Sequence, residues 1–169
     1  MNLLKEISEI TLGLENPEVP ENVYTLRKSA RALLFNDKGE IALQFLEAYN
    51  FHKLPGGAIE SNESKQEALH RELLEEVGCT VEMGNELGVI IEYCNTSKLI
   101  HISYAYIAKV RDFIQNPTLE ANEIEEKQRT VWLQPTEALE QMSKDVPQKF
   151  EGLFIKEREI AFLKEFLKI

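Results

Sequence analysis

Residues 64–77 contain neither glycine nor proline and carry opposite chemistry on two sides of a helical projection. With about 100° of rotation per residue, the carboxylates of Glu72, Glu75 and Glu76 fall on one side. The other side is apolar and consists of Leu69, Leu73, Leu74 and Val77. The spacing predicts a helix that packs its apolar face on a core and leaves its acidic face for another purpose. The fold of this chain must therefore bury the apolar side of this helix and leave its acidic side accessible.

The acidic face needs an explanation, because carboxylates at i, i+3 and i+4 repel one another by about 0.2–0.5 kcal/mol per pair. A divalent cation reverses this penalty. Mg²⁺ and Mn²⁺ prefer oxygen ligands, and Mg²⁺ keeps bound waters and takes further ligands from substrate phosphates. The face formed by Glu72, Glu75 and Glu76 is therefore suited to a site for metal and phosphate.

A Pro-Gly-Gly turn at residues 55–57 precedes this helix. Glycine lets a backbone carbonyl approach a ligand without a Cβ in the way, so a carbonyl of this turn is a candidate further metal ligand. Arg71 lies one position before the acidic face. It can reach Glu75 at i+4, and its guanidinium can also hold Glu63 if the loop folds back. We expect Arg71 to organise the carboxylates and not to clamp phosphate.

The stretch that begins at Gly57 resembles the signature of the Nudix hydrolases, G-x5-E-x7-R-E-U-x-E-E-x-G-U, in which U is apolar. Every fixed position is filled, by Gly57, Glu63, Arg71, Glu72, Leu73, Glu75, Glu76, Gly78 and Cys79. Asn62 stands where the family often has Gly, and Asn tolerates the same left-handed conformation. The order of the strands before and after the motif is also similar to that of the family.

The resemblance implies an α/β protein with the Nudix fold, an α/β/α sandwich with a mixed β-sheet between helices. It implies hydrolysis of the pyrophosphate bond of a nucleoside diphosphate linked to another moiety X, by water attack on phosphorus with Mg²⁺ or Mn²⁺. It also implies roles for named residues: Glu75, Glu76 and the Gly56 carbonyl as metal ligands, Glu72 as ligand or base, and Gly57, Glu63 and Arg71 as structural support of the site. Metal ions would neutralise phosphate oxygens and lower the pKa of a bound water, so the protein need supply only carboxylates and geometry.

Nudix enzymes also use an acid outside the motif, on the loop before a late strand. Here that loop precedes Trp132 and offers four acids: Glu120, Glu123, Glu125 and Glu126. By its distance from Trp132, Glu126 is the expected catalytic acid, and Glu123 is the second choice. A solvated acidic loop is the alternative for each of them. Substrate-binding residues are unknown at this stage; His52, Tyr104, Tyr106 and Trp132 are candidates that core packing explains as well.

The rest of the chain predicts one sheet covered by helices. Residues 1–22 are expected to form an N-terminal helix or arm with a linker, and residues 23–169 a single Nudix domain. The expected strands are 25–35 and 41–46 (a hairpin), 49–54, 81–94 and 99–110 (an antiparallel pair), and 130–133. The expected helices after the motif are 135–142 and 153–167, and 111–127 is expected to be a loop.

Composition narrows the class of partner. The chain of 169 residues has a formal net charge of −10, which disfavours direct DNA binding. No apolar stretch approaches the roughly 20 residues that span a bilayer, and the N-terminus lacks a secretory pattern, so we expect a cytoplasmic protein without a membrane segment. Cys79 and Cys94 are expected to be buried, reduced thiols. The sequence leaves the oligomeric state open, a homodimer included.

Two other functions remain to be weighed. The first is a catalytically inactive Nudix-like module that binds or senses a nucleotide, which would not need the complete set of Glu72, Glu75 and Glu76. The second is an acidic helical interaction protein, which would need sustained heptads that this sequence lacks. A small nucleotide-type substrate is therefore the expected partner, and its identity depends on loops that the motif does not cover.

Overall fold

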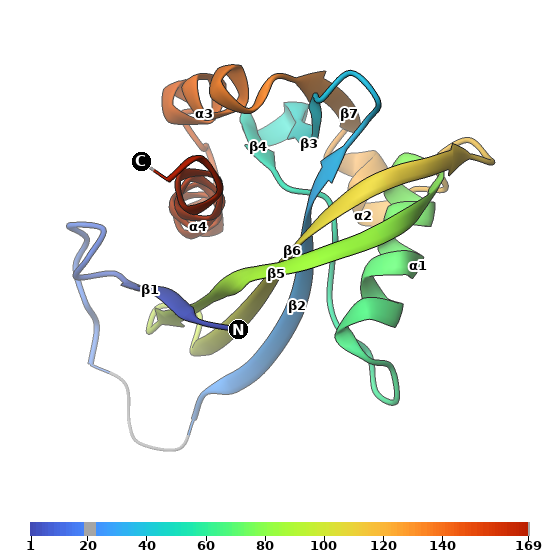
Figure 1. The fold of residues 1–169 in the computed structure, drawn as a ribbon. Coiled ribbons are helices and arrows are strands. Elements are labelled where there is room, and N and C mark those ends of the chain that lie inside the picture. The colour runs from blue at the N-terminus through green and yellow to red at the C-terminus, as the bar shows by residue number, and fades with distance from the viewer. Residues whose placement is uncertain (19–22, 169) are drawn as a thin grey trace.

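Seven strands form one mixed sheet in the computed structural model, which describes residues 1–18 and 23–168 (Figure 1). They are β1 (Leu3–Ser8), β2 (Thr25–Phe35), β3 (Ile41–Leu46), β4 (Phe51–Lys53), β5 (Cys79–Cys94), β6 (Leu99–Phe113) and β7 (Gln128–Leu133). The order across the sheet is β1-β5-β6-β2-β3-β4, and β7 pairs with β3. The pairs β1·β5 and β2·β6 are parallel, and the other pairs are antiparallel.

Helices cover both faces of this sheet. α1 (Lys65–Val77) lies on one face, and α4 (Phe150–Leu167) lies on the other, close to α3 (Pro135–Lys144) (Figure 1). A short helix, α2 (Ala121–Glu125), and a 3-10 turn (Glu47–Tyr49) lie in the connections. These layers confirm the predicted α/β class and the α/β/α sandwich.

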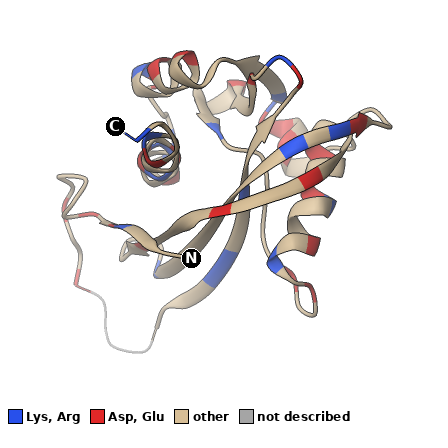
Figure 2. Cartoon of the chain, viewed as in Figure 1, with Lys and Arg blue, Asp and Glu red and all other residues tan. Residues whose placement is uncertain are grey.

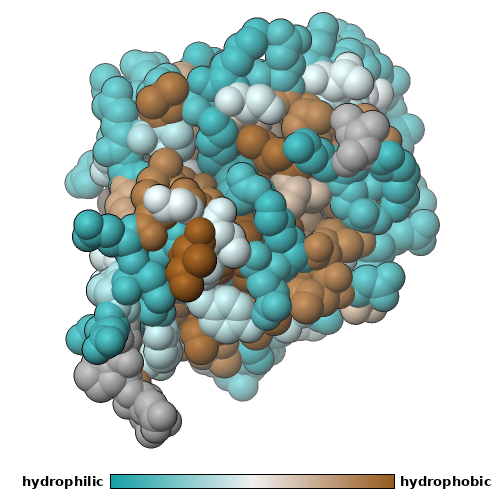
Figure 3. Space-filling model, turned by 90° about the vertical axis from the view of Figure 1, so that its left-hand side faces the viewer, coloured by the Kyte–Doolittle hydropathy of each residue, from teal (hydrophilic) through white to brown (hydrophobic). Residues whose placement is uncertain are grey.

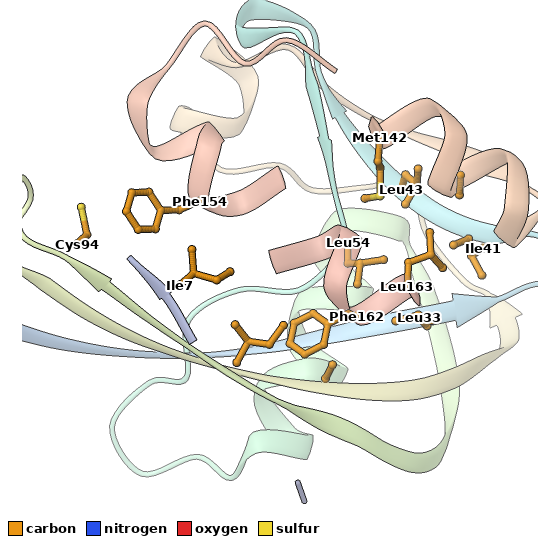
Figure 4. Packing of buried hydrophobic residues seen from close by; sticks show 13 residues of the cluster. Ile7, Leu33, Ile41, Leu43, Leu54, Cys94, Met142, Phe154, Phe162 and Leu163 are labelled. Carbon is orange, nitrogen blue, oxygen red and sulfur yellow. The ribbon is translucent and has the colours of Figure 1, made fainter. Parts of the chain in front are cut away.

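Each face of the sheet has its own apolar core, because successive side chains of a strand point to opposite faces. On β2, Leu33 packs with Phe162 and Leu163 of α4, in the cluster shown in Figure 4. Its neighbour Leu34 packs on the other face with Leu69 of α1. Burial of adjacent side chains of β2 therefore holds α4 against one face of the sheet and α1 against the other.

The predicted helix at 64–77 is confirmed as α1. Ser64 caps its first turn. The Ser64 hydroxyl oxygen accepts a hydrogen bond from the backbone N–H of Glu67, and the Glu67 carboxylate accepts one from the backbone N–H of Ser64. The helix ends at Gly78, where φ is +76° and a Cβ would lie 2.1 Å from the carbonyl oxygen of Gln115. Leu69 and Leu73 are fully buried, as the apolar face predicts.

Of the helix or arm expected near the N-terminus, the helix is wrong, because this segment forms β1 at the edge of the sheet, parallel to β5. Only Ile7 of its apolar residues is fully buried, whereas Leu3 is 53% and Ile10 is 68% exposed. Figure 3 looks onto this side of the molecule and shows hydrophobic atoms among hydrophilic ones. Sheet pairing therefore outweighs the helical spacing, and residues 19–22 of the predicted linker lie outside the described residues.

Other expectations need smaller changes. The expected hairpin of β2 and β3 has a single paired position, Phe35 with Ile41, because β2 pairs along its length with β6. The expected loop at 111–127 begins inside β6 and contains α2. Both cysteines are buried and free, as predicted. No helix among the described residues is long and apolar enough to cross a membrane.

Candidate active site

The glycine turn before α1 packs directly against the acidic face of this helix. The backbone N–H of Gly56 donates to Oε2 of Glu76 over 2.6 Å. A Cβ at Gly57 would lie 2.2 Å from Oε1 of Glu72, so only glycine leaves room for this carboxylate. Figure 2 shows acidic residues on α1 and on the neighbouring α2, among others elsewhere in the chain. The structure thus brings together the turn and the carboxylates that the sequence singles out.

Gly56 has a second neighbour that the sequence analysis missed. Nη1 of Arg31, on β2, donates to the Gly56 carbonyl and, over 3.4 Å, to the Leu54 carbonyl. Gly56 itself has φ of +123°, and a Cβ there would lie 2.2 Å from the Ala30 carbonyl oxygen. The signal that could have found Arg31 is its place in the sequence, as a charged residue between apolar residues of a buried strand.

Glu76 is the most buried carboxylate of α1, with 2% of its surface exposed. Besides the Gly56 amide, it accepts from Nε2 of Gln128 over 2.9 Å. Its Oε1 also lies 3.3 Å from Nζ of Lys53. These contacts satisfy a charge that would otherwise be costly to bury, and they join α1, β4 and β7 at one carboxylate.

Arg71 organises the remaining carboxylates, as the sequence predicts. Its guanidinium lies 2.8 Å from both Glu63 and Glu72, 3.3 Å from Glu75, and 3.1 Å from the Ala58 carbonyl. The hydrogen bond from Arg71 lowers the pKa of Glu63. Burial raises the pKa of Glu72, although Arg71 opposes the shift. A single side chain therefore fixes the loop and the first turns of the acidic face.

Of the four loop acids, Glu123 is the one that lies beside the helix carboxylates. It is 8% exposed, and Gln128 donates to it over 3.4 Å while also donating to Glu76. Burial, together with the charge of Glu76, raises the pKa of Glu123 to about 7. Glu126, the expected acid, instead lies 3.4 Å from Nζ of Lys149. The reason is local, because α2 turns the chain so that these two acids face different neighbours.

Glu120 is the N-cap residue of α2 and, like Glu125, is exposed. The structure therefore separates the loop into one buried acid beside Glu76 and three acids with other surroundings.

The donor chemistry of this cluster fits a hard divalent cation, since every candidate ligand atom is an oxygen. The ligands are not gathered in advance. In the described part of the chain, no three acidic, histidine or cysteine side chains are arranged to hold a metal ion. Glu72 and Glu75 are turned toward Arg71, and Glu76 toward Gly56 and Lys53. Side-chain rotation would be enough to free these oxygens, because both helix and turn are held by other contacts.

The histidine and aromatic candidates have structural surroundings. His52 is buried and lies 3.0 Å from Asp145 through Nδ1. Tyr106 belongs to the core under α1, and Trp132 packs edge-to-face on Phe113. Tyr104 lies under the ammonium of Lys65. Core packing and local contacts account for these side chains, as the alternative interpretation expects.

A cavity of about 370 Å³ lies beside the glycine turn, between the sheet and the first turns of α4. Arg31 and Lys53 form its border with the carboxylate cluster, because each lines the cavity and also contacts that cluster or its turn. Phe154 and Ile155 of α4 line the opposite side. The site therefore has a carboxylate part and an adjoining hollow.

Comparison with known families decides the class of this site. Residues 25–153 match the model of the NUDIX domain family. The chain belongs to the Nudix family. This confirms the predicted membership and, with it, the prediction of a Nudix hydrolase. Among proteins with curated descriptions, none matches the chain.

Solved structures show the same fold in this Nudix protein and in distant relatives. The E. coli ORF135 protein has 24% identity and a TM-score of 0.58, covering 89% of this chain and 94% of that one. A NUDIX hydrolase from Nitrosomonas europaea has 15% identity and a TM-score of 0.63, covering 85% and 90%. An ADP-ribose pyrophosphatase from Streptococcus suis has 17% identity and a TM-score of 0.54, covering 86% and 94%. At these identities the likeness concerns the fold.

Proposed function

We propose that this protein hydrolyses the pyrophosphate bond of a nucleoside diphosphate linked to another moiety, by attack of water on phosphorus. The observation that carries the proposal is the contact of the Gly56-Gly57 turn with Glu76 and Glu72, together with Gln128, which donates to both Glu76 and Glu123. These acids come from a helix and a distant loop, and a cation bound between them would offset their mutual repulsion. Phosphoryl transfer needs such a site, because its catalysis depends on positioning and on charge neutralisation.

Glu72, Glu75, Glu76 and the Gly56 carbonyl would hold Mg²⁺ or Mn²⁺. When bound, such an ion neutralises phosphate oxygens and lowers the pKa of a bound water. The carbonyl can take this role while it accepts from Arg31, since a carbonyl oxygen has two lone pairs. Arg71 and Glu63 would hold the loop in place, and Gly57 would leave space for the Glu72 carboxylate.

Glu123 is the acid that we propose for proton transfer. Its Oε2 accepts from the backbone N–H of Glu120 over 2.8 Å and its Oε1 from Gln128 over 3.4 Å, and these contacts fix a carboxylate whose oxygens keep further lone pairs for a proton from water. A pKa of about 7 suits this role, because a general base works best near the ambient pH. Glu72, whose pKa burial also raises, is the second candidate.

A small anionic nucleotide is the proposed partner, and the cytoplasm is the proposed location. The fold is shared with proteins described as an ADP-ribose pyrophosphatase and a UDP-X diphosphatase, which supports this class without choosing within it. The test is a panel of nucleoside triphosphates, nucleotide sugars, ADP-ribose and dinucleoside polyphosphates, incubated with Mg²⁺ and with excess chelator and assayed by chromatography for both products of pyrophosphate-bond cleavage. Hydrolysis of at least one compound, lost in chelator, is expected.

An inactive nucleotide sensor is the second candidate, and the same panel separates it from the enzyme. A sensor would bind a member of the panel in calorimetry without hydrolysing any of them. Glu76→Gln provides the matched control for trace contamination, since a contaminating hydrolase would survive that substitution. Turnover that is equal in the wild type and in Glu76→Gln would contradict the proposed activity.

A further inference from the structure

Two cationic side chains connect the carboxylate cluster with the cavity. Nζ of Lys53 lies 3.3 Å from Oε1 of Glu76, and the Lys53 side chain is 14% exposed. Nη1 of Arg31 donates to the Gly56 carbonyl on the other side of the turn. Both side chains also line the cavity of about 370 Å³. A group that extends from the cluster into the cavity would therefore lie near both cations.

Arg31 is buried in a way that leaves part of its hydrogen-bonding capacity unused. The residue is 6% exposed, and its Nε is buried without a hydrogen-bond partner among the described residues. Burial, and then the charge of Arg158, lowers the pKa of Arg31. An unsatisfied buried donor costs about 1–3 kcal/mol, and more when the group is charged. Because the Arg31 side chain also lines the adjoining cavity, an anion bound there would offset the cost of burying its charge.

The cavity has the opposite charge to the protein as a whole, whose net charge is −10. Its cationic lining residues outnumber its acidic ones, and they are Arg27, Arg31, Lys53, Lys149 and Arg158 against Glu92, Glu126 and Glu151. Two of the acids are already paired, Glu92 with Arg158 over 2.8 Å and Glu126 with Lys149 over 3.4 Å. Lys53 also faces an acid, Glu76 at 3.3 Å, so Arg31 and Arg27 supply the remaining positive charge of the lining, and Lys53 adds to it when it leaves Glu76.

We propose that Arg31 and Lys53 bind a phosphate group of the substrate at the mouth of this cavity and so direct the attached moiety into it. The inference rests on the proposed function in assuming a phosphate-bearing substrate, but it does not require turnover. A planar guanidinium suits two phosphate oxygens at once, and an ammonium suits one. Lys53 would leave Glu76 when a cation binds there and would then face the phosphate.

The test uses inorganic pyrophosphate and the intact protein in excess chelator, with calorimetry as the readout. We expect pyrophosphate to bind without metal, and Lys53→Met to weaken this binding at least about tenfold, the scale of one charge-assisted contact. Lys109→Met is the matched control, because Lys109 is 59% exposed and pairs with Asp37 away from the cavity lining. Absence of pyrophosphate binding, or equal binding by wild type and Lys53→Met, would overturn the proposal.

A second readout separates phosphate binding from a structural role. Lys53→Met removes the ammonium that faces Glu76, so binding of Mn²⁺, followed by the magnetic resonance of the free ion, should stay equal or tighten. Weaker binding of both Mn²⁺ and pyrophosphate would show that Lys53 supports the site's fold and would overturn the assignment. Arg31→Lys retains the charge but not the planar fork, and we expect it too to weaken pyrophosphate binding with Mn²⁺ binding retained. Failure of the hydrolysis panel would leave this binding result intact, so the two proposals fail separately.

Discussion

The carboxylate of Glu76 on α1 accepts a 2.6 Å hydrogen bond from the backbone N–H of Gly56 in the preceding turn. This contact joins the helix that carries the acids to the turn that carries the candidate carbonyl ligand. The same carboxylate meets Gln128 of β7 and Lys53 of β4. Glu76 is thus a structural junction as well as a proposed metal ligand, and substitutions there should affect both properties.

Glu76→Gln should lower turnover by about 10²–10⁴, the scale expected when one fixed electrostatic partner is lost. The reason is that the amide retains the shape of the carboxylate but not its charge. Initial rates at saturating Mg²⁺ measure this effect. Wild-type turnover in the folded variant would contradict the assignment of Glu76.

The stability of Glu76→Gln should fall by about 1–3 kcal/mol, because the new amide group would face donors of Gly56, Gln128 or Lys53. Relief of carboxylate repulsion alone predicts an unchanged or higher melting temperature, and the buried contacts outweigh it. Glu75→Gln is the control, since the Glu75 side chain is 36% exposed. Its melting temperature should stay near that of the wild type.

Glu123→Gln should lower the maximal rate at saturating Mg²⁺ by at least about tenfold, if this acid takes a proton in the reaction. Glu126→Gln should change it by less than about twofold, because Glu126 faces Lys149 and not Glu76. Steady-state rates of the two variants, prepared side by side, provide the measurement. A larger loss of rate in Glu126→Gln than in Glu123→Gln would show that Glu126, and not Glu123, takes the proton.

Gly57→Ala should abolish most activity while the fold survives. The new methyl would lie within 2.2 Å of Glu72 Oε1, and this side chain, 13% exposed, can turn away. Gly56→Ala should instead destabilise the protein by about 3 kcal/mol or more, because both its φ of +123° and the Ala30 carbonyl oppose a Cβ. Urea denaturation and rates of both variants distinguish them. Equal stability losses would contradict this division.

Stability should fall as the pH decreases from about 6.5 to 4, through His101. Burial lowers the pKa of His101 to about 4 in the folded protein. As the pH falls below about 6.5, the unfolded chain binds a proton at this residue that the folded protein does not bind, so the free energy of unfolding decreases. The loss should reach about 1–3 kcal/mol in urea denaturation at several pH values. His101→Asn, which retains a donor toward Glu92, should flatten the curve in this window.

Below this window a second loss is expected from Glu92. Burial by itself raises the pKa of Glu92, but the charge of Arg158 and the contact with His101 outweigh burial and lower this pKa to about 2. Its contribution is therefore present above about pH 4.5 and disappears as the pH falls toward 2. The low-pH loss should persist in His101→Asn, since Arg158 still faces Glu92 over 2.8 Å. Its disappearance in that variant would show that His101 alone sets the pKa of Glu92.

The sequence by itself determined the helix at 64–77, its two faces and the pairing of Arg71 with Glu63. These features depend on residues close together in the chain, where helical spacing decides which side chains meet. The motif also indicated the family, because its fixed residues lie close together in the chain, from Gly57 to Cys79, and can be matched without knowing the fold. The strands after the motif followed from alternating patterns that turn residues separate.

Only the tertiary structure decided which distant residues complete the site. The N-terminal segment forms β1 because its backbone pairs with the distant strand β5, and the local spacing of apolar residues carries no information about that pairing. Glu123 met Glu76 through α2 and Gln128, whereas a ranking by distance along the chain favoured Glu126. Arg31 reached the Gly56 carbonyl because β2 lies under the turn. Each of these contacts joins elements far apart in sequence, so burial and sheet register had to fix them.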